Sequence, residues 1–310
     1  MEFRKLGNTG LKVTEIGLGG NNFGWRADES ASITVIKHAL DQGINFIDTA
    51  DMYDRGRSEE FVAKAVKSQR SRVIIATKFP MVMGDGPNER GGSRYYIMKA
   101  VEDSLRRLQT DYIDLYQMHE IDPTTPVEET LRALDDLIRD GKVRYIGCSN
   151  FAAWQLCEAL WTSRAHNLHS FVTVQPEYSL LARQIERELV PCCQEYDVGV
   201  IPYRPLAGGF LTGKYRQGEE IPSDWRLSSP ATRYGNVMTE SNWSKLAKLE
   251  AFAAARGHAM GELALAWLLA KPYISTVIAG AKSVEQVSAN IAAAEWKLTA
   301  EEAAEVDAIS

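Results

Sequence analysis

The sequence of 310 residues has only four cysteines and five histidines. It contains no Cys-x-x-Cys pair and no His-Glu-x-x-His run, so the standard zinc spacings are absent and we expect no metal site. The cysteines are Cys148, Cys157, Cys192 and Cys193. A redox pair between the adjacent Cys192 and Cys193 remains an alternative. Disulfides between neighbours are strained, however, and the segment PCCQEYDVG is typical of a helix that leads into a buried strand.

Long apolar runs and an excess of positive charge are also missing. No stretch reaches the roughly 18 apolar residues of a membrane helix. The N-terminal segment MEFRKLGNTGLKV lacks the apolar core of a signal peptide, so we expect a cytoplasmic protein. The net charge of −6 and a pI near 5.5 disfavour nucleic acids and anionic membranes as partners, because both attract clustered Lys and Arg. With 45% hydrophobic and 25% charged residues, the chain has the composition of a globular domain.

Short apolar runs alternate with amphipathic stretches along the chain. Eight runs have the length and composition of strands: Glu15–Gly19, Asn45–Asp48, Val73–Lys78, Ile113–His119, Val143–Ser149, Phe171–Gln175, Val198–Tyr203 and Thr276–Ala279. The stretches between them have helical period, as in Ser32–Gln42, Glu59–Lys67, Arg94–Leu108, Val127–Arg139 and Ile185–Glu195. Strands that are apolar on both faces and separated by helices predict a parallel sheet. Eight such units in about 280 residues, with no break in composition, predict a single α/β domain over residues 1–310, a (β/α)₈ TIM barrel.

Two segments depart from this alternation. Residues 2–13 (EFRKLGNTGLKV) hold two short strand-like pieces around Gly-Asn-Thr-Gly, which predicts a β-hairpin ahead of the barrel. The stretch Gly208–Ser241, after the seventh strand, is rich in Gly, Pro and Ser and is too long for a simple connection. Such an excursion is typical of a functional loop, often a lid.

Polar residues close six successive strands at their C-terminal ends. They are Asp48, Lys78, His119, Ser149 with Asn150, Gln175 and Tyr203. A single polar strand end means little, because every strand that meets solvent has one. Six in succession predict an active site, because this end of a barrel is where active sites form.

The glycine-rich nucleotide motifs are absent. The run Gly17–Gly24 (GLGGNNFG) lacks the spacing of G-x-G-x-x-G, and there is no P-loop pattern. A nucleotide would therefore have to bind through the loops at the top of the barrel. The turn Gly280–Ser283, which precedes a predicted helix at Val284–Ala293, offers a helix N-terminus and the cation Lys282 for a phosphate.

Several motifs together resemble the aldo-keto reductase family. They are Gly43–Tyr53 (GINFIDTADMY), Thr77–Lys78, the strand that ends in His119, Gly147–Phe151 (GCSNF), Gln175–Tyr178 (QPEY) and Tyr203–Tyr215 (YRPLAGGFLTGKY). The resemblance runs essentially from end to end, in the family's order and spacing. Gly280–Asn290 (GAKSVEQVSAN) is most similar to the branch that includes bacterial reductases and the potassium-channel β subunits.

The resemblance implies that Tyr53 is the proton donor and that Asp48, Lys78 and His119 complete the family's catalytic tetrad. Chemistry supports these roles. Reduction of a carbonyl by hydride forms an alkoxide, which requires a proton, and a tyrosine with a pKa of about 10 is a weak acid. A nearby Lys78 cation favours the tyrosinate, Asp48 can keep Lys78 charged, and His119 can orient the substrate oxygen.

The resemblance also implies an NADPH/NADP⁺ cofactor. Ser149, Asn150 and Gln175 would bind the nicotinamide carboxamide, and Tyr203 would stack on its ring. Positions around the phosphates and adenosine would be Lys214, Arg226, Gly280, Lys282, Gln286 and Asn290. Two alternatives stay open: Ser149 and Asn150 could cap the following helix, and Arg226 could be a solvated surface residue. Ala289 stands where the related branch often has a glutamate that binds the adenine amine. The resemblance therefore does not imply this adenine contact here.

The sequence identifies fewer substrate-binding residues than cofactor-binding residues. Asn21, Asn22 and Phe23 replace an aromatic residue that many family members carry. Candidates for the mouth of the site are Trp25, Met52, Met81 and Trp225, although Met and Trp are also common in cores. We predict an NADP(H)-dependent oxidoreductase that interconverts a carbonyl compound and an alcohol. The alternatives are a nucleotide-sensing regulatory subunit with vestigial chemistry, and a dehydrogenase acting mainly on a sugar or secondary alcohol.

Overall fold

A computed structural model describes residues 1–223, 225–228 and 237–310, and its centre is an eight-stranded parallel sheet. The strands follow the order β10–β3–β4–β5–β6–β7–β8–β9. Their bounds are Ile16–Gly19 (β3), Phe46–Asp48 (β4), Ile74–Phe79 (β5), Ile113–Met118 (β6), Val143–Ser149 (β7), Thr173–Gln175 (β8), Gly199–Val200 (β9) and Val277–Gly280 (β10). The sheet closes on itself, because Val200 pairs in parallel with Ile274 and the N–H of Ile278 donates to the Pro202 carbonyl at 3.0 Å. The predicted (β/α)₈ barrel is confirmed.

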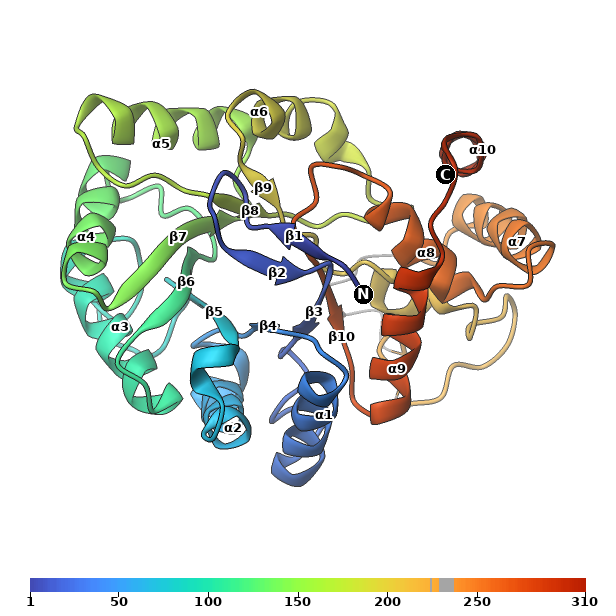
Figure 1. Cartoon of the computed structure of the whole chain (residues 1–310), viewed down its shortest axis with the longest axis horizontal. Helices are drawn as coiled ribbons and strands as arrows, with labels where there is room; N and C mark the ends of the chain where they lie inside the picture. The colour runs from blue at the N-terminus through green and yellow to red at the C-terminus, as the bar shows by residue number, and fades with distance from the viewer. Residues whose placement is uncertain (224, 229–236) are drawn as a thin grey trace.

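Helices surround the sheet on its outer side (Figure 1). The α-helices are Glu29–Asp41 (α1), Arg57–Val66 (α2), Arg94–Leu108 (α3), Val127–Arg139 (α4), Ala153–Ala165 (α5), Leu189–Glu195 (α6), Glu240–Ala254 (α7), Met260–Leu269 (α8), Val284–Ala292 (α9) and Ala300–Ile309 (α10). Short 3₁₀ helices are Tyr53–Gly56 (η1), Arg70–Arg72 (η2), Gln184–Glu186 (η3), Ala207–Thr212 (η4) and Ala293–Glu295 (η5). The helix expected over Ile185–Glu195 divides into η3 and α6.

Side-chain caps explain where several helices begin. Asp28 accepts the Ala31 N–H at 2.9 Å, so α1 starts three residues earlier than its apolar period predicts. Ser93 caps α3, and Ser283 caps α9 by accepting the Gln286 N–H. Thr299 and Glu302 form a reciprocal capping box at α10. Each cap satisfies an amide that the helix itself leaves unpaired.

The predicted hairpin is confirmed as β1 (Phe3–Lys5) paired antiparallel with β2 (Lys12–Thr14). It lies across the N-terminal end of the barrel in Figure 1. Leu6 and Val13 are fully buried and join the small core inside the barrel, with Phe46, Ala76, Leu115, Ile201 and Ile278. The hairpin turn needs Gly7, whose φ is +56° and whose place a Cβ could not share with the carbonyl oxygen of Val172. The hairpin therefore closes this end of the barrel.

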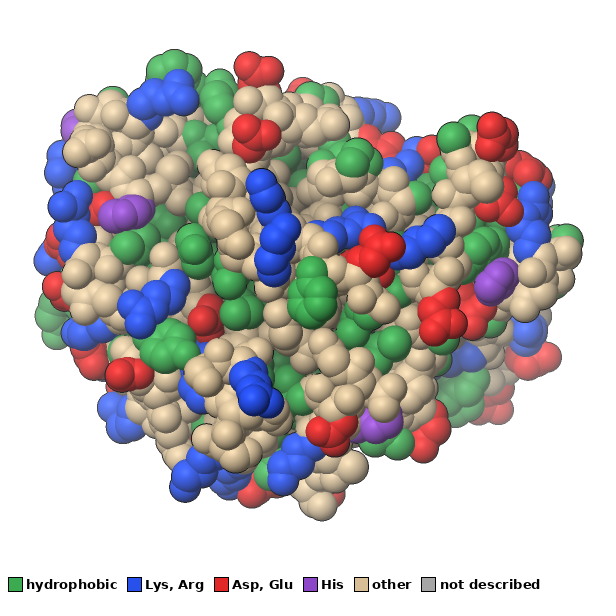
Figure 2. Space-filling model, viewed as in Figure 1, with side chains coloured by type: hydrophobic (Ala, Val, Ile, Leu, Met, Phe, Trp, Pro, Cys, Tyr) green, Lys and Arg blue, Asp and Glu red, His purple; other side chains and the backbone are tan. Residues whose placement is uncertain are grey.

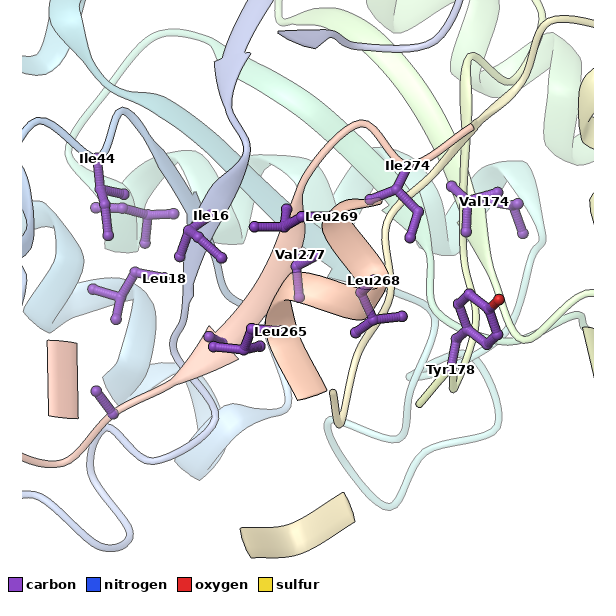
Figure 3. Close-up of a cluster of buried hydrophobic side chains, with 14 of the residues drawn as sticks. Ile16, Leu18, Ile44, Val174, Tyr178, Leu265, Leu268, Leu269, Ile274 and Val277 are labelled. Carbon is purple, nitrogen blue, oxygen red and sulfur yellow. The ribbon is translucent and has the colours of Figure 1, made fainter. Parts of the chain in front are cut away.

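A second, larger core fills the space between the sheet and the helices. Figure 3 shows Leu265 and Leu268 of α8 close to Val277 of β10, beside Ile274, with Ile16 and Leu18 of β3 nearby. All of these side chains are buried. Eight of the ten residues of α8 are buried, because η4, α7, α9 and η5 all pack against this helix. This packing holds β10 and the start of α9 in place.

Charges on the surface are mixed. In Figure 2, Lys and Arg side chains alternate with Asp and Glu over the face that carries the hairpin. Among the helices that the structure describes, none is long and apolar enough to span a bilayer. Cys192 and Cys193 are neighbours in α6 and all four cysteines are free thiols, so the structure does not contain the redox-pair disulfide. Burial raises the pKa of Cys193 to about 12.

The long segment after β9 is also present. It begins with η4 and continues to α7, which starts at Glu240. In its described part, between η4 and α7, the chain forms no helix or strand. Residues 224 and 229–236 of the predicted Gly208–Ser241 loop lie outside the described residues. The described part returns Lys214, Trp225 and Arg226 to the top of the barrel.

Candidate active site

A buried ammonium group organises the C-terminal end of the barrel. Lys78, on β5, is 0% exposed, and its Nζ donates to Asp48 Oδ2 at 2.6 Å, to the Thr49 carbonyl at 2.8 Å and to the Tyr53 hydroxyl at 3.2 Å. An ammonium group has three protons, so each is directed at one acceptor. The arrangement places the Tyr53 oxygen against a fixed positive charge.

Two opposing effects act on the pKa of Lys78. Burial alone lowers the pKa of the amine, because removal from water disfavours the charged form. The Asp48 carboxylate and the Tyr53 oxygen act in the other direction, through charge and hydrogen bonds, and the pKa of Lys78 is raised overall. The side chain is therefore charged at neutral pH.

Two glutamines hold the other oxygen of Asp48. Oδ1 accepts from Gln117 Nε2 at 3.2 Å and from Gln175 Nε2 at 2.8 Å. Gln117, on β6, is fully buried and is absent from the residues that we predict from the sequence. A signal was available, since a glutamine inside the apolar strand IDLYQM must find a buried polar partner. Asp48 is thus anchored from three strands.

Tyr53 stands at the start of a tight turn. It follows β4 and begins η1, in which Asp54 and Arg55 have φ values of +47° and +55°. The Tyr53 ring meets the His119 ring edge-on, with centroids 5.9 Å apart. His119 follows the last residue of β6. The four residues of the predicted tetrad are therefore brought together.

A cavity of about 1160 Å³ opens above this group. Asp48, Tyr53 and His119 line it, while Lys78 lies beneath the surface. All ten predicted cofactor residues also line it: Ser149, Asn150, Gln175, Tyr203, Lys214, Arg226, Gly280, Lys282, Gln286 and Asn290. The cavity is of the size that proteins use for cofactors together with small substrates.

The predicted substrate residues divide into two groups. Asn21, Asn22, Trp25, Met52 and Trp225 line the cavity. Phe23 is fully buried in the outer core, and the expectation that Met81 lines the mouth is wrong, since it is not among the described residues of the lining. The carbonyl of Met81 instead accepts the hydroxyl of Tyr96 at 3.2 Å.

One wall of the cavity is a hydrogen-bonded chain of the predicted nicotinamide residues. Ser149 Oγ donates to the Gln175 carbonyl at 2.6 Å. Asn150 Nδ2 donates to the His119 carbonyl at 3.0 Å, and its Oδ1 accepts the Tyr203 hydroxyl at 2.8 Å. Burial is the main cause that raises the pKa of Tyr203 to about 12, so its phenol stays neutral.

The capping alternative for Ser149 and Asn150 is wrong. The N-cap of α5 is Ala152, whose N–H donates to Gln155 Oε1 at 2.8 Å. Asn150 has a left-handed backbone with φ of +60°, and its amide joins the top of β6 to Tyr203, as described above. Both side chains therefore belong to the wall of the cavity and not to the helix end.

Cations gather in the part of the cavity beside the start of α9. Lys282 precedes the N-cap of α9, and its N–H donates to Gln286 Oε1 at 2.8 Å. From the long loop, Lys214 Nζ lies 4.5 Å from the centre of the Trp225 ring, and Arg226 donates to Asn22 Oδ1. Positive side chains beside a helix N-terminus are suited to an anion. Arg226 is thus a lining residue of the cavity, held by a hydrogen bond.

Arg204 is a further lining residue that the sequence did not single out. Its backbone is left-handed, with φ of +55°, and its guanidinium contacts Glu177 Oε2 at 3.1 Å. It follows Tyr203 in the chain, and its positive charge opposes the rise in the pKa of Tyr203 that burial causes. The sequence could have indicated Arg204, because it directly follows Tyr203, which was selected as a polar residue at the C-terminal end of a strand.

Comparisons with known proteins agree with this geometry. The model of the aldo/keto reductase family matches residues 15–310. The uncharacterized oxidoreductase YrpG of Bacillus subtilis is 38% identical, over 97% of this chain and 93% of its own length. A protein of Schizosaccharomyces pombe named as a voltage-gated potassium channel subunit beta is also 38% identical, over 99% and 92%.

The versiconal hemiacetal acetate reductase of Aspergillus parasiticus is 35% identical, over 97% of this chain and 95% of its own length. The family model spans every strand of the barrel and the four residues of the predicted tetrad. The chain belongs to the aldo/keto reductase family and is an oxidoreductase.

Proposed function

We propose that this chain, as one domain over residues 1–310, is an NADP(H)-dependent reductase that interconverts an aldehyde or ketone and the corresponding alcohol. The observation that carries the proposal is the contact of the Tyr53 hydroxyl with the buried Lys78 Nζ at 3.2 Å, on the floor of a cavity large enough for a cofactor and a substrate. This contact gives a phenol the means to release a proton at neutral pH.

Tyr53 supplies the proton for the reduction. When bound, the nicotinamide supplies the hydride to the carbonyl carbon. As negative charge grows on the carbonyl oxygen, Tyr53 transfers its hydroxyl proton to that oxygen. Lys78 stabilises the tyrosinate that remains, and Asp48 keeps Lys78 charged and directed. In the reverse direction the tyrosinate accepts the proton of the alcohol.

His119 orients the reacting oxygen. Its ring stands edge-on to Tyr53, so the two side chains form adjacent sides of the place where a carbonyl oxygen would sit. A ring N–H that donates to this oxygen adds to the stabilisation of its developing charge. The Asn150 amide fixes the backbone of His119 through its 3.0 Å bond to the His119 carbonyl.

The cavity wall fits a nicotinamide. Ser149, Asn150 and Gln175 supply hydroxyl and amide groups for a carboxamide, and the neutral Tyr203 ring offers a flat surface for stacking. Gln175 Nε2 is bonded to Asp48, which leaves its Oε1 as an acceptor for an amide N–H. Gln117 holds Asp48 Oδ1 whether or not Gln175 keeps its bond.

The basic end of the cavity favours NADPH over NADH. The 2′-phosphate that distinguishes them carries nearly two negative charges. Lys282, just before the N-terminus of α9, and Arg226 both line the cavity. Gln286 and Asn290, on α9, supply polar groups beside the same site, and Lys214 adds a cation for the bridging phosphates.

A second function is favoured by one comparison. The similarity to proteins named as potassium channel β subunits supports a nucleotide-sensing regulatory role with slow chemistry. Turnover separates the two functions. We expect steady consumption of NADPH at 340 nm with 4-nitrobenzaldehyde, and a screen of sugars and secondary alcohols with NADP⁺ tests the dehydrogenase alternative. Binding of NADPH with no turnover of any carbonyl or alcohol would favour the regulatory role.

A further inference from the structure

A second buried polar cluster, which the proposed chemistry does not use, lies behind the Tyr53 turn. Its acidic members are Asp51, two residues before Tyr53, and Glu59 in the first turn of α2. Asp51 is 1% exposed and Glu59 is 0% exposed. Arg107, from α3, is the cation that bonds to this cluster. Two buried carboxyl groups thus lie within the influence of one guanidinium, which bonds to Glu59.

The hydrogen bonds identify which carboxyl group carries the charge. Glu59 Oε1 accepts the Thr77 hydroxyl at 2.6 Å, and its Oε2 accepts Arg107 Nε at 2.6 Å. Both oxygens of Glu59 are therefore satisfied, as a buried carboxylate requires. The guanidinium uses another of its N–H groups on Ser104 Oγ at 3.2 Å. Glu59 and Arg107 form the ionised pair.

Asp51 has the opposite pattern. Its Oδ1 accepts the Met52 N–H at 2.6 Å, while its buried Oδ2 has no hydrogen-bond partner among the described residues. A second buried carboxylate beside Glu59 would be costly, so Asp51 keeps its proton. Burial first and the charge of Glu59 second raise its pKa to about 8, against the opposing influence of Met52, Arg107 and Lys78.

This cluster grips both ends of the Tyr53 turn. At the start, the Asp51 N–H donates to the Lys78 carbonyl at 3.3 Å, and its carboxyl group holds Met52. At the end, Gly56 has φ of +92°, and a Cβ there would overlap the Arg107 side chain. Between them, Asp54 and Arg55 hold left-handed conformations, which are strained for residues other than glycine. Such a turn persists only where its surroundings hold it.

We propose that Asp51 is a positioning residue of the reaction, whose neutral carboxyl group holds the turn that presents Tyr53 to Lys78 and the substrate. The inference rests on the proposed role of Tyr53 as proton donor. Loss of the Asp51 proton adds a negative charge near Lys78, beside Asp48 and the Tyr53 oxygen, and this charge disfavours the tyrosinate. The Asp51 carboxylate is also repelled by the charge of Glu59. Catalysis then declines in alkaline solution.

The groups that face Asp51 come from four elements. They are Glu59 from α2, Arg107 and Tyr96 from α3, Lys78 from β5 and Tyr116 from β6. Burial raises the pKa values of both tyrosines above their ordinary range, so neither adds charge near pH 8. Lys78 and Arg107 have raised pKa values and stay cationic. Asp51 is thus the member of this cluster that changes charge near pH 8.

The test is the pH profile of kcat for reduction, from about pH 6 to about pH 10, in wild type, Asp51→Ala, Asp51→Asn and Glu59→Gln. We expect Asp51→Ala to lower kcat at pH 7 at least tenfold. Asp51→Asn, which keeps the Met52 acceptor and is always neutral, should restore kcat to within about threefold of wild type. The wild-type decline near pH 8 should be missing in Asp51→Asn. In Glu59→Gln it should move at least about one pH unit lower, because the repelling charge is gone.

The inference is overturned if the Asp51→Asn and wild-type profiles coincide, or if Asp51→Ala equals wild type at pH 7. If Asp51→Ala does not fold, the Asp51→Asn profile still decides.

Thermal unfolding gives a readout without turnover. The Tm of Asp51→Asn minus that of wild type should grow from about pH 5 to about pH 8, because in wild type only the unfolded chain releases this proton over that range. An inactive wild type, or an unaffected Tyr53→Phe, would refute the proposed function instead, while a flat Tm difference would refute the buried proton.

Discussion

Individual atoms around Lys78 can be removed with little change in shape, which makes the residue scale the sharpest level for testing the site. Tyr53→Phe removes the hydroxyl oxygen, Lys78→Met removes a positive charge and Asp48→Asn removes a negative charge. Two hydrogen bonds join the three groups, because Lys78 Nζ donates to both Asp48 and Tyr53. Because the three groups are so close, the three variants should differ in activity only if the groups have different roles.

Tyr53→Phe should abolish most turnover and leave cofactor binding intact. General acid catalysis contributes about 10²–10⁴-fold, or about 3–5 kcal/mol, and the ring that shapes the cavity remains. The measurements are kcat with an aldehyde and the Kd of NADPH. Tyr95→Phe, on the exposed surface of α3, is the matched control and should behave as wild type. Retention of more than about a tenth of wild-type kcat would remove Tyr53 from the role of acid.

Lys78→Met should be inactive, and Asp48→Asn should keep more activity. Methionine cannot stabilise a tyrosinate, whereas asparagine leaves the lysine in place. Without Asp48, however, burial acts on Lys78 with less opposition and lowers the pKa of its amine. We therefore expect the residual activity of Asp48→Asn to fall at a lower pH than that of wild type. The pH profiles of kcat, with circular dichroism to show that each variant folds, are the test. An active Lys78→Met beside an inactive Asp48→Asn would reverse the two roles.

Much of the site could be predicted at this scale because its residues stand at strand ends. Asp48, Lys78 and His119 each close an apolar run, and the barrel brings such ends together. Gln117 was missed because it lies within a strand, where its partner depends on the register of β5 and β6. Asp51 and Glu59 were missed because their burial depends on Arg107, which lies 48 residues beyond Glu59.

At the scale of elements, the N-terminus of α9 is the feature with the clearest function. Its first amides, the Ser283 cap and Lys282 meet at the edge of the cavity beside β10. The short β10 strand reaches this edge because α8 packs behind it (Figure 3). The proposed phosphate end of the site is therefore held by a strand, a turn and a helix.

Lys282→Ala should weaken NADPH and not NADH. A charge-assisted contact to phosphate contributes about 1.5–3 kcal/mol, which corresponds to a tenfold to hundredfold rise in Kd. NADH has no group at that position for the cation to bind. The measurement is a pair of fluorescence titrations, with Lys67→Ala, an exposed lysine after α2, as the control. A change below about threefold for NADPH, or tighter binding of NADH to wild type, would contradict phosphate recognition by Lys282.

The elements themselves were predictable wherever one face alone is buried. Helix α4 has a clear apolar stripe and matches its predicted bounds, Val127–Arg139. Helix α5 lacks such a stripe, because Trp154 and Trp161 are exposed. The closing contact of the barrel could not be anticipated either, since it joins Val200 to Ile274, and Ile274 lies outside the runs that indicate strands. Tertiary packing decides in both cases.

At the scale of the whole molecule, the response of stability to pH combines two carboxyl groups with opposite signs. Asp51 favours the fold below pH 4, and this contribution is lost as the pH rises toward about 8. Asp122 acts in the other direction. Burial alone raises its pKa, but bonds from Thr124, Gly92 and Thr125 lower it to about 2. Its contribution is present above pH 4 and is lost as the pH falls toward 2.

Asp122→Asn should therefore destabilise the barrel at neutral pH and have little effect near pH 2. The carboxylate joins the loop after β6 to the Gly92 N–H, just before α3, at 2.8 Å. Because the group is partly exposed, we expect a loss of only about 1 kcal/mol at pH 7 after screening by solvent. Chemical denaturation at several pH values measures the difference. A difference that stays constant down to pH 2 would show that the carboxylate charge is not its source.

The hairpin that closes the N-terminal end of the barrel has a consequence for the order of events. Leu6 and Val13 fill that end, so cofactor and substrate must both use the opening at the other end. The nicotinamide wall lies deep beside Asp48 and Gln175, whereas Trp25 is 63% exposed at the mouth. On the proposed function, a cofactor that reaches this wall would enter before the substrate and leave after the product. The proposed alcohol would then depart before the oxidised cofactor, and the opening would admit new cofactor only after both have left.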